Sequence, residues 1–180
     1  MRILKEDSLG LVIDMQEKLF PHIDQNQILM RNTTILLKGL ESLGISVIFT
    51  EQYPVGLGPT LQEFKTHITH FKPVEKISFS CCDEETFLDE LKYSGKKNII
   101  LCGVEAHVCV LQTVLDLLKR SYIPVVIADC VSSRKRDDKI IALERMRQEG
   151  AVISSYESIL FELARIAGTD TFKTISKLVK

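Results

Sequence analysis

One cysteine of this sequence stands where a thiol could act as a nucleophile. Cys109 follows the apolar run 98–102 and the turn Gly103-Val-Glu-Ala-His, and a helical pattern begins at this point. The free N–H groups and the dipole at the start of a helix favour a negatively charged thiolate. Cys109 is therefore a candidate nucleophile, whereas Cys102, still inside the apolar run, is read as a core residue.

Two further residues have the chemistry that a nucleophilic cysteine needs. Asp14 follows the first apolar run, and Lys76 lies in the short extended segment 71–80 beside apolar residues. A nearby cation lowers the pKa of a thiol, and a carboxylate can move protons between nucleophile, leaving group and water. Each residue also has a simpler interpretation, with Asp14 as a helix cap, Lys76 as a surface lysine and Cys109 as core filling.

The elements that would position these residues alternate along the chain. Strand-like apolar runs are separated by helical patterns, and they cover residues 9–13, 45–49, 98–101, 124–128 and 151–154. This alternation is typical of a parallel sheet covered by helices. We predict a single domain, 1–180, with a three-layer α/β/α fold and a mostly parallel, Rossmann-like sheet of about six strands. Ligands of such sheets bind beyond the carboxyl ends of the strands, where Asp14 and Cys109 fall.

Apolar residues at helical spacing, and glycines at which a helix would end, predict the positions of the helices. They cover about residues 29–43, 83–93, 111–118 and 137–148, followed by one or two closing helices in the last thirty residues. Residues 51–76 form the longest irregular region, and its Gly56-Leu-Gly-Pro59 is read as a turn, since no lysine-serine pair follows. The mixed charges of residues 134–139 are read as a solvated surface.

The composition and charge of the chain limit the classes of partner that we expect. The chain is 45% hydrophobic and 26% charged with a formal net charge of -1, which favours a small-molecule substrate over nucleic acid. No apolar run is long enough for a membrane span, and the N-terminus has no signal-peptide core, so we expect no membrane partner and a cytoplasmic protein. The five cysteines, an odd number without a C-x-x-C pair, are expected to be reduced.

At several motifs the sequence resembles the isochorismatase-like cysteine hydrolases, most closely the branch of isochorismatase domain-containing proteins. The resemblance covers nearly the whole chain and rests on Val12–Gln16, Thr50–Thr60, Lys76–Ser80, Gly103–Cys109, Ala128–Ser133 and Phe172–Leu178. The most specific of these motifs is Glu-Gln-Tyr-Pro in the second segment.

The resemblance implies a catalytic triad of Asp14, Lys76 and Cys109. It also implies a cis peptide bond between Val104 and Glu105, which turns the N–H groups of Glu105 and Cys109 toward a shared oxyanion site. In this mechanism Cys109 attacks an acyl carbon, Asp14 passes a proton to the departing amine and activates water, and Lys76 stabilises the thiolate. Among the neighbours of these residues, the substrate pocket is expected to include Phe20, Gln52, Tyr53 and His107.

The sequence departs from better-known relatives of this group. Nicotinamidases carry an aspartate and two histidines that hold a metal after the second strand, whereas this loop reads Glu51-Gln-Tyr-Pro-Val and has no histidine. We therefore expect no metal and no cofactor, and His67 and His70 are read as solvated loop residues. Enzymes that cleave isochorismate typically lack the nucleophilic cysteine, so Cys109 argues against that substrate.

The leading functional hypothesis is a metal-independent cysteine hydrolase acting on a small amide or related acyl compound. The alternatives are a catalytically idle small-molecule-binding or scaffold protein on the same fold, and a thiol redox sensor that uses Cys81 and Cys82. The resemblance also implies a homo-oligomer, dimer or larger.

Overall fold

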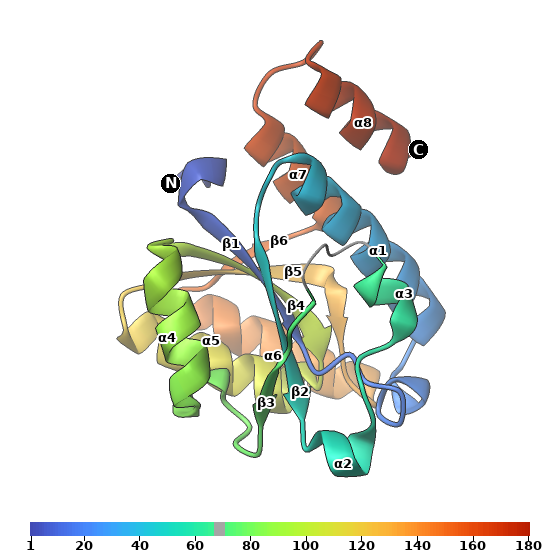
Figure 1. Cartoon of the computed structure of the whole chain (residues 1–180), viewed down its shortest axis with the longest axis vertical. Helices are drawn as coiled ribbons and strands as arrows, with labels where there is room; N and C mark the ends of the chain where they lie inside the picture. Colours follow the sequence, from blue (N-terminus) through green and yellow to red (C-terminus); the bar gives the residue numbers. More distant parts are fainter. Residues whose placement is uncertain (67–70) are drawn as a thin grey trace.

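The structure, a computed structural model, describes residues 1–66 and 71–180 and is built around one parallel sheet (Figure 1). The six strands lie in the order β3-β2-β1-β4-β5-β6, and every neighbouring pair is parallel. Their bounds are β1 (Ser8–Ile13), β2 (Val47–Gln52), β3 (Val74–Lys76), β4 (Asn98–Val104), β5 (Ile123–Ser132) and β6 (Val152–Ser154). The predicted mostly parallel sheet is thus confirmed.

Helices cover both faces of the sheet, as the three-layer prediction requires (Figure 1). One face carries α1 (Asn26–Ser42) and α7 (Tyr156–Ala164), and α8 (Asp170–Leu178) packs against both of these helices. The other face carries α4 (Glu85–Ser94), α5 (Leu111–Lys119) and α6 (Arg136–Gln148). Shorter helical segments complete the chain: η1 (Lys5–Asp7), η2 (Phe20–His22), α2 (Pro54–Leu57), α3 (Gln62–Lys65), η3 (Cys81–Asp83) and the π-helix η4 (Ala106–Val110).

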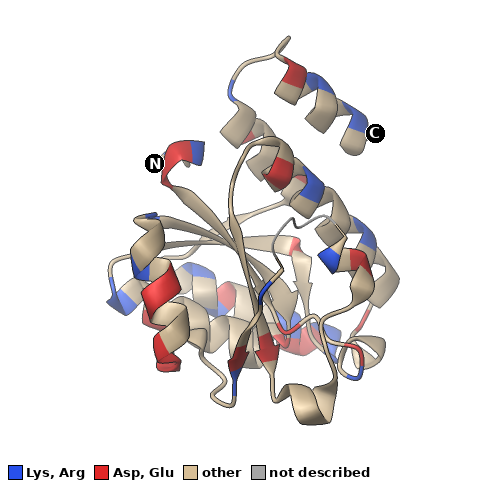
Figure 2. Cartoon of the chain, in the orientation of Figure 1, with Lys and Arg blue, Asp and Glu red and all other residues tan. Residues whose placement is uncertain are grey.

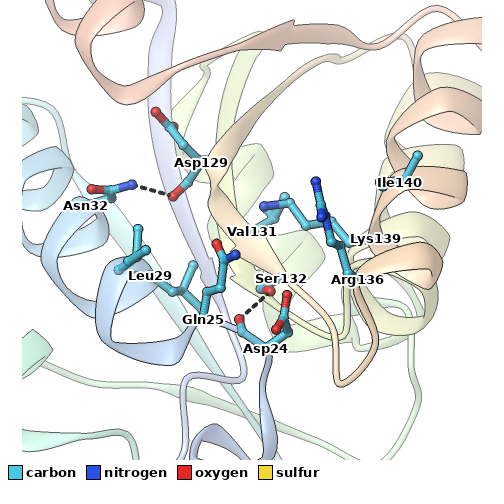
Figure 3. Close-up of a pocket in the computed structure, with 11 residues that line it drawn as sticks. Asp24, Gln25, Leu29, Asn32, Asp129, Val131, Ser132, Arg136, Lys139 and Ile140 are labelled. Atoms are coloured by element: carbon cyan, nitrogen blue, oxygen red, sulfur yellow. Dashed lines mark hydrogen bonds between the residues drawn. The ribbon is translucent and has the colours of Figure 1, made fainter.

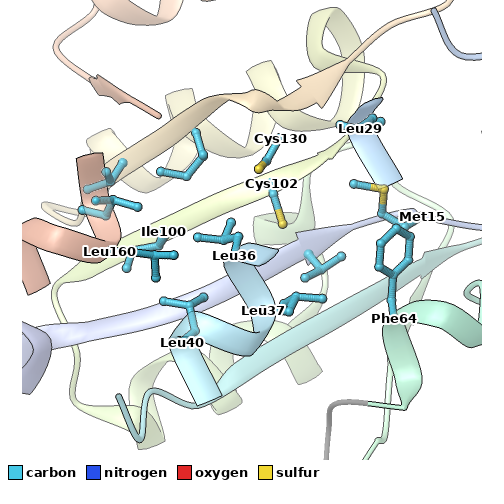
Figure 4. Close-up of a cluster of buried hydrophobic side chains, with 14 of the residues drawn as sticks. Met15, Leu29, Leu36, Leu37, Leu40, Phe64, Ile100, Cys102, Cys130 and Leu160 are labelled. Atoms are coloured by element: carbon cyan, nitrogen blue, oxygen red, sulfur yellow. The ribbon is translucent and has the colours of Figure 1, made fainter. Parts of the chain in front are cut away.

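Alternate residues of the central strands supply two hydrophobic cores, one on each side of the sheet. In β4, Ile100 and Cys102 face the core under α1, where Leu36 and Leu40 pack, as Figure 4 shows. Their neighbours Ile99 and Leu101 face the core under α4, α5 and α6. Because β4 is buried on both faces, it reads as a continuous apolar run in the sequence.

The structure changes the bounds of several predicted strands, with β4 continuing to Val104 and β5 to Ser132, and it subdivides one loop. The second strand starts at Val47 and continues to Gln52, so Thr50, Glu51 and Gln52 belong to the sheet rather than to the loop after it. The region 51–76 also contains α2, α3 and β3, which the sequence left as irregular or extended chain. His67 and His70 lie outside the described residues.

Charges of both signs occur on the same helices, including α1, α6 and α8, as Figure 2 shows. This mixture agrees with the formal net charge of -1. Within the described residues, none of the helices has the length and apolar character that crossing a membrane requires.

Candidate active site

Asp14 and Lys76 form a buried ion pair at the carboxyl ends of neighbouring strands. Asp14 follows β1 and Lys76 ends β3, with β2 between them. The Lys76 Nζ lies 2.7 Å from the Asp14 Oδ2, and both side chains are 0% exposed. A charge buried so fully is tolerated only with a partner and further hydrogen bonds.

Those further hydrogen bonds are present. The Thr50 hydroxyl donates to the other Asp14 oxygen, Oδ1, at 2.8 Å. The Lys76 ammonium donates to Gln52 Oε1 at 2.7 Å and to the carbonyls of Ser78 and Phe79, each at 3.2 Å. Since both charged groups have several partners, their positions at the end of the sheet are fixed.

Cys109 reaches the same region from β4 through the π-helix η4. Its side chain is buried, and its carbonyl accepts a hydrogen bond of 2.7 Å from the Thr113 hydroxyl one turn later. Gly103 brings this turn close to β1, because a Cβ at residue 103 would lie only 2.5 Å from the Ile13 carbonyl oxygen. Glycine is therefore needed where the strand that delivers Cys109 meets the strand that delivers Asp14.

The peptide bond between Val104 and Glu105 is trans, which corrects the expected cis bond. No peptide bond in the described part of the chain is cis. The chain turns here because Glu105 adopts a left-handed conformation, with φ at 55°.

Asp14, Glu105 and Cys109 line one cavity of about 650 Å³. A volume of this size lies within the range that is usual for small-molecule sites. The wall is completed by residues from four other segments: Lys18, Leu19, His22, Gln52, Leu57, Phe79, Val108 and Arg134. Cys109 and the buried carboxylate of Asp14 thus line the same open cavity.

The electrostatics of Cys109 differ from the sequence prediction. Burial and the negative charge of Asp14 raise the pKa of the Cys109 thiol above its ordinary value, although the Lys76 cation lowers it. Burial, the largest single effect, lowers the pKa of Lys76, but the charge and hydrogen bond of Asp14 together with the Cys109 and Cys81 thiols outweigh burial, so the net direction is upward. The upward direction of the Cys109 pKa is opposite to the lowered thiol pKa that the sequence predicts.

The comparisons with known proteins agree with this fold. The family model described as the isochorismatase domain matches residues 8–158. The chain is 39% identical to isochorismatase domain-containing protein 2 of Danio rerio over 178 residues, covering 99% of this chain and 89% of that protein. The chain belongs to the isochorismatase family. This confirms the resemblance on which the expected triad rests.

Solved structures of similar proteins share the isochorismatase fold. The structure of the MAR1 ribonuclease from Caenorhabditis elegans superposes with a TM-score of 0.93 at 37% identity, covering 99% of this chain and 92% of that one. The YcaC gene product of Escherichia coli, described as an octameric hydrolase of unknown specificity, has the same TM-score at 24% identity and covers 99% and 89%. At that identity the YcaC comparison supports the fold alone.

The structure brings only one of the four expected pocket residues to the cavity of this isochorismatase-family chain. Gln52 lines it and also binds Lys76. Phe20 is buried in the core, with its ring 6.0 Å from that of Phe64, and Tyr53 is 51% exposed outside the cavity wall. His107 faces Ser133, whose Oγ lies 2.9 Å from the ring Nδ1.

Arg134 is a site residue that the sequence analysis missed. Its guanidinium donates to both oxygens of Glu105, at 2.9 and 3.4 Å, and it lines the cavity while its side chain stays 59% exposed, in line with the predicted solvated surface. Its position just beyond the carboxyl end of β5 was the available signal, since ligands of parallel sheets bind there. Among the residues described, no three His, Cys, Asp or Glu side chains form a group suited to a metal ion.

Proposed function

We propose that this isochorismatase-family chain is a metal-independent cysteine hydrolase that acts on a small amide or related acyl compound. The observation that carries the proposal is the cavity lined by both Cys109 and Asp14, with the Asp14 carboxylate paired to the buried Lys76. A nucleophile and a proton carrier at one small-molecule cavity, with a fixed cation bound to the proton carrier, are the parts that covalent acyl transfer needs.

In the first step the Cys109 sulfur attacks the acyl carbon while its proton passes to Asp14. The raised pKa of the Cys109 thiol means that the proton has to leave during the attack rather than before it. Lys76, bound to Asp14 at 2.7 Å, holds the carboxylate in place, and its positive charge favours the sulfur anion as that charge develops.

The oxygen of the attacked carbonyl becomes negative as the carbon–sulfur bond forms. The N–H groups of Glu105 and Cys109 would stabilise this oxyanion. When the carbon–nitrogen bond breaks, the amine leaves with the proton from Asp14. Water then gives a proton to Asp14 and attacks the thioester, which releases the acid and returns the proton to Cys109.

A panel of small amides, tested for amine release, checks the proposal. Wild-type protein should release amine and show a mass increase of one acyl group on Cys109, whereas Cys109→Ala should do neither. Cys102→Ala is the matched control, because Cys102 is also buried but lies in β4 with its thiol toward the Leu11 carbonyl. Turnover that survives Cys109→Ala would contradict the mechanism. Binding without turnover would instead favour the non-catalytic binding protein.

RNA is a second candidate substrate because the similar nematode protein is described as a ribonuclease. RNA cleavage by the wild type should be compared with cleavage by Cys109→Ala in the same preparation. We propose that no nucleic acid is a partner of this chain. Neither the wild type nor Cys109→Ala should therefore cleave RNA. Cleavage that requires Cys109 would move the assignment to the ribonuclease reading.

We further propose a homo-oligomer, dimer or larger, in the cytoplasm. The octameric assembly of YcaC, which has the same fold, supports the oligomer. All five cysteines are free and buried, which suits a reducing compartment.

A further inference from the structure

A second cavity, of about 280 Å³, lies between α1, β5 and α6 (Figure 3). The described residues that line it do not include any that line the active-site cavity. Its wall combines carboxylates, cations and aliphatic side chains. None of these residues takes part in the proposed hydrolase mechanism or in the Asp14–Lys76 ion pair.

Two carboxylates and two cations face this second cavity. Asp24 precedes α1 and Asp129 belongs to β5, while Arg136 and Lys139 belong to the first turn of α6. Figure 3 shows the carboxylate of Asp129 on one side of the cavity and the side chains of Arg136 and Lys139 on the other. Within the described chain, no ion pair shorter than 4.0 Å joins any two of these four side chains.

Part of this arrangement is held by the backbone. Asp129 Oδ1 accepts a hydrogen bond of 2.9 Å from the Tyr156 N–H, and the Asp129 carbonyl accepts one of 3.0 Å from the Asn32 amide. On the floor of the cavity, the Ser132 hydroxyl donates to the Asp24 carbonyl at 2.9 Å. The carboxylate of Asp129 is thus fixed in position, as a binding site for a charged ligand requires.

Asp129 and Lys139 are half-buried, and within the described chain neither side chain belongs to an ion pair shorter than 4.0 Å. Burial raises the pKa of the Asp129 carboxyl and lowers the pKa of the Lys139 ammonium, although each is partly offset by the charge of the other. Burial disfavours an unpaired charge. A ligand with a positive end at the carboxylates and a negative end at the cations therefore gains binding free energy from both contacts.

We propose that this second cavity binds a small zwitterion of the amino-acid class with an aliphatic body. The ammonium of the ligand lies at Asp129 and Asp24, and its carboxylate lies at Lys139 and Arg136. Aliphatic side chains complete the wall and match an apolar body of the ligand: Ile28, Leu29, Val131 and Ile140.

Isothermal titration calorimetry with four matched compounds tests the charge requirement. L-leucine and its isomer ε-aminocaproate are both zwitterions, and their two charges are close together in leucine and far apart in ε-aminocaproate. Isoamylamine carries only the positive charge, and isocaproate carries only the negative charge. At least one of the two zwitterions should bind, and both singly charged compounds should bind at least about tenfold more weakly. If no compound binds, or if a singly charged compound binds as tightly as the zwitterions, the proposal is overturned.

Two substitutions place the binding in this cavity. Lys139→Met keeps the aliphatic stem, and Asp129→Asn keeps an oxygen for the Tyr156 N–H, so both variants retain the local packing. Each should weaken the zwitterion at least about tenfold. Lys135→Met and Asp137→Asn make the same charge changes at exposed residues outside the cavity and should bind like the wild type. Equal binding by all four variants would overturn the site.

Discussion

At the scale of single residues, the ion pair between Asp14 and Lys76 is the most demanding feature of the chain. Both side chains are completely buried, so each depends on the other for its charge. Lys76→Met should lower the free energy of unfolding in urea by about 3–5 kcal/mol, because it leaves a buried carboxylate without its cation. The double variant Asp14→Leu/Lys76→Met should recover much of this loss, since it removes both charges.

Lys72→Met is the control for this prediction, because Lys72 is exposed and its substitution should change stability by no more than about 0.5 kcal/mol. A double variant that is less stable than Lys76→Met alone would show that the buried charge is not the cause of the loss.

Residue types and positions predicted Asp14, Lys76 and Cys109 as a group, and two of these residues were expected at strand ends. They could not predict which neighbours complete the site. Thr50 and Arg134 meet Asp14 and Glu105 only because strands far apart in the sequence pair side by side. The upward direction of the Cys109 pKa could not be predicted for a similar reason, since the effect of a carboxylate on a thiol depends on how close the fold brings them.

At the scale of elements, the junction between β4 and η4 determines where Cys109 stands. Gly103 has a φ of 152°, and a Cβ there would collide with the Ile13 backbone. Gly103→Ala should therefore lower the free energy of unfolding by about 1–3 kcal/mol and also change the rate at which Cys109 is alkylated.

Gly150→Ala is the matched variant for this junction, because Gly150 also has a positive φ, of 107°, but no atom lies within 4 Å of an added Cβ. It should lower stability through backbone strain alone and leave the Cys109 alkylation rate unchanged. Equal changes of that rate in both variants would show that the junction does not position the cysteine.

Helices and strands were largely predictable because their patterns are local. The helix starting near Leu29 and the strand before Asp14 follow from apolar spacing and glycine stops. The π-helix around Cys109 and the short β3 were not resolved by the sequence, since a single widened turn and a three-residue strand leave no periodicity to read.

At the scale of the whole molecule, we predict that identical chains assemble into a homo-oligomer. Sedimentation velocity of the purified protein should show a species of at least twice the mass of one chain. The exposed aliphatic residues Ile140 and Ile141 on α6 are consistent with further burial between copies. A single species with the mass of one chain at micromolar concentration would contradict this prediction.

The most direct test of the central claim is the pH dependence of iodoacetamide labelling at Cys109, read by peptide mass spectrometry in wild type, Asp14→Asn and Lys76→Met. The wild-type thiol should titrate above the ordinary range of about 8.5. Asp14→Asn should lower the pKa of Cys109 because it removes a negative charge that opposes the thiolate, and Lys76→Met should raise it because it removes a favourable positive charge. A Cys109 pKa that neither substitution moves would contradict a nucleophile coupled to the Asp14–Lys76 pair.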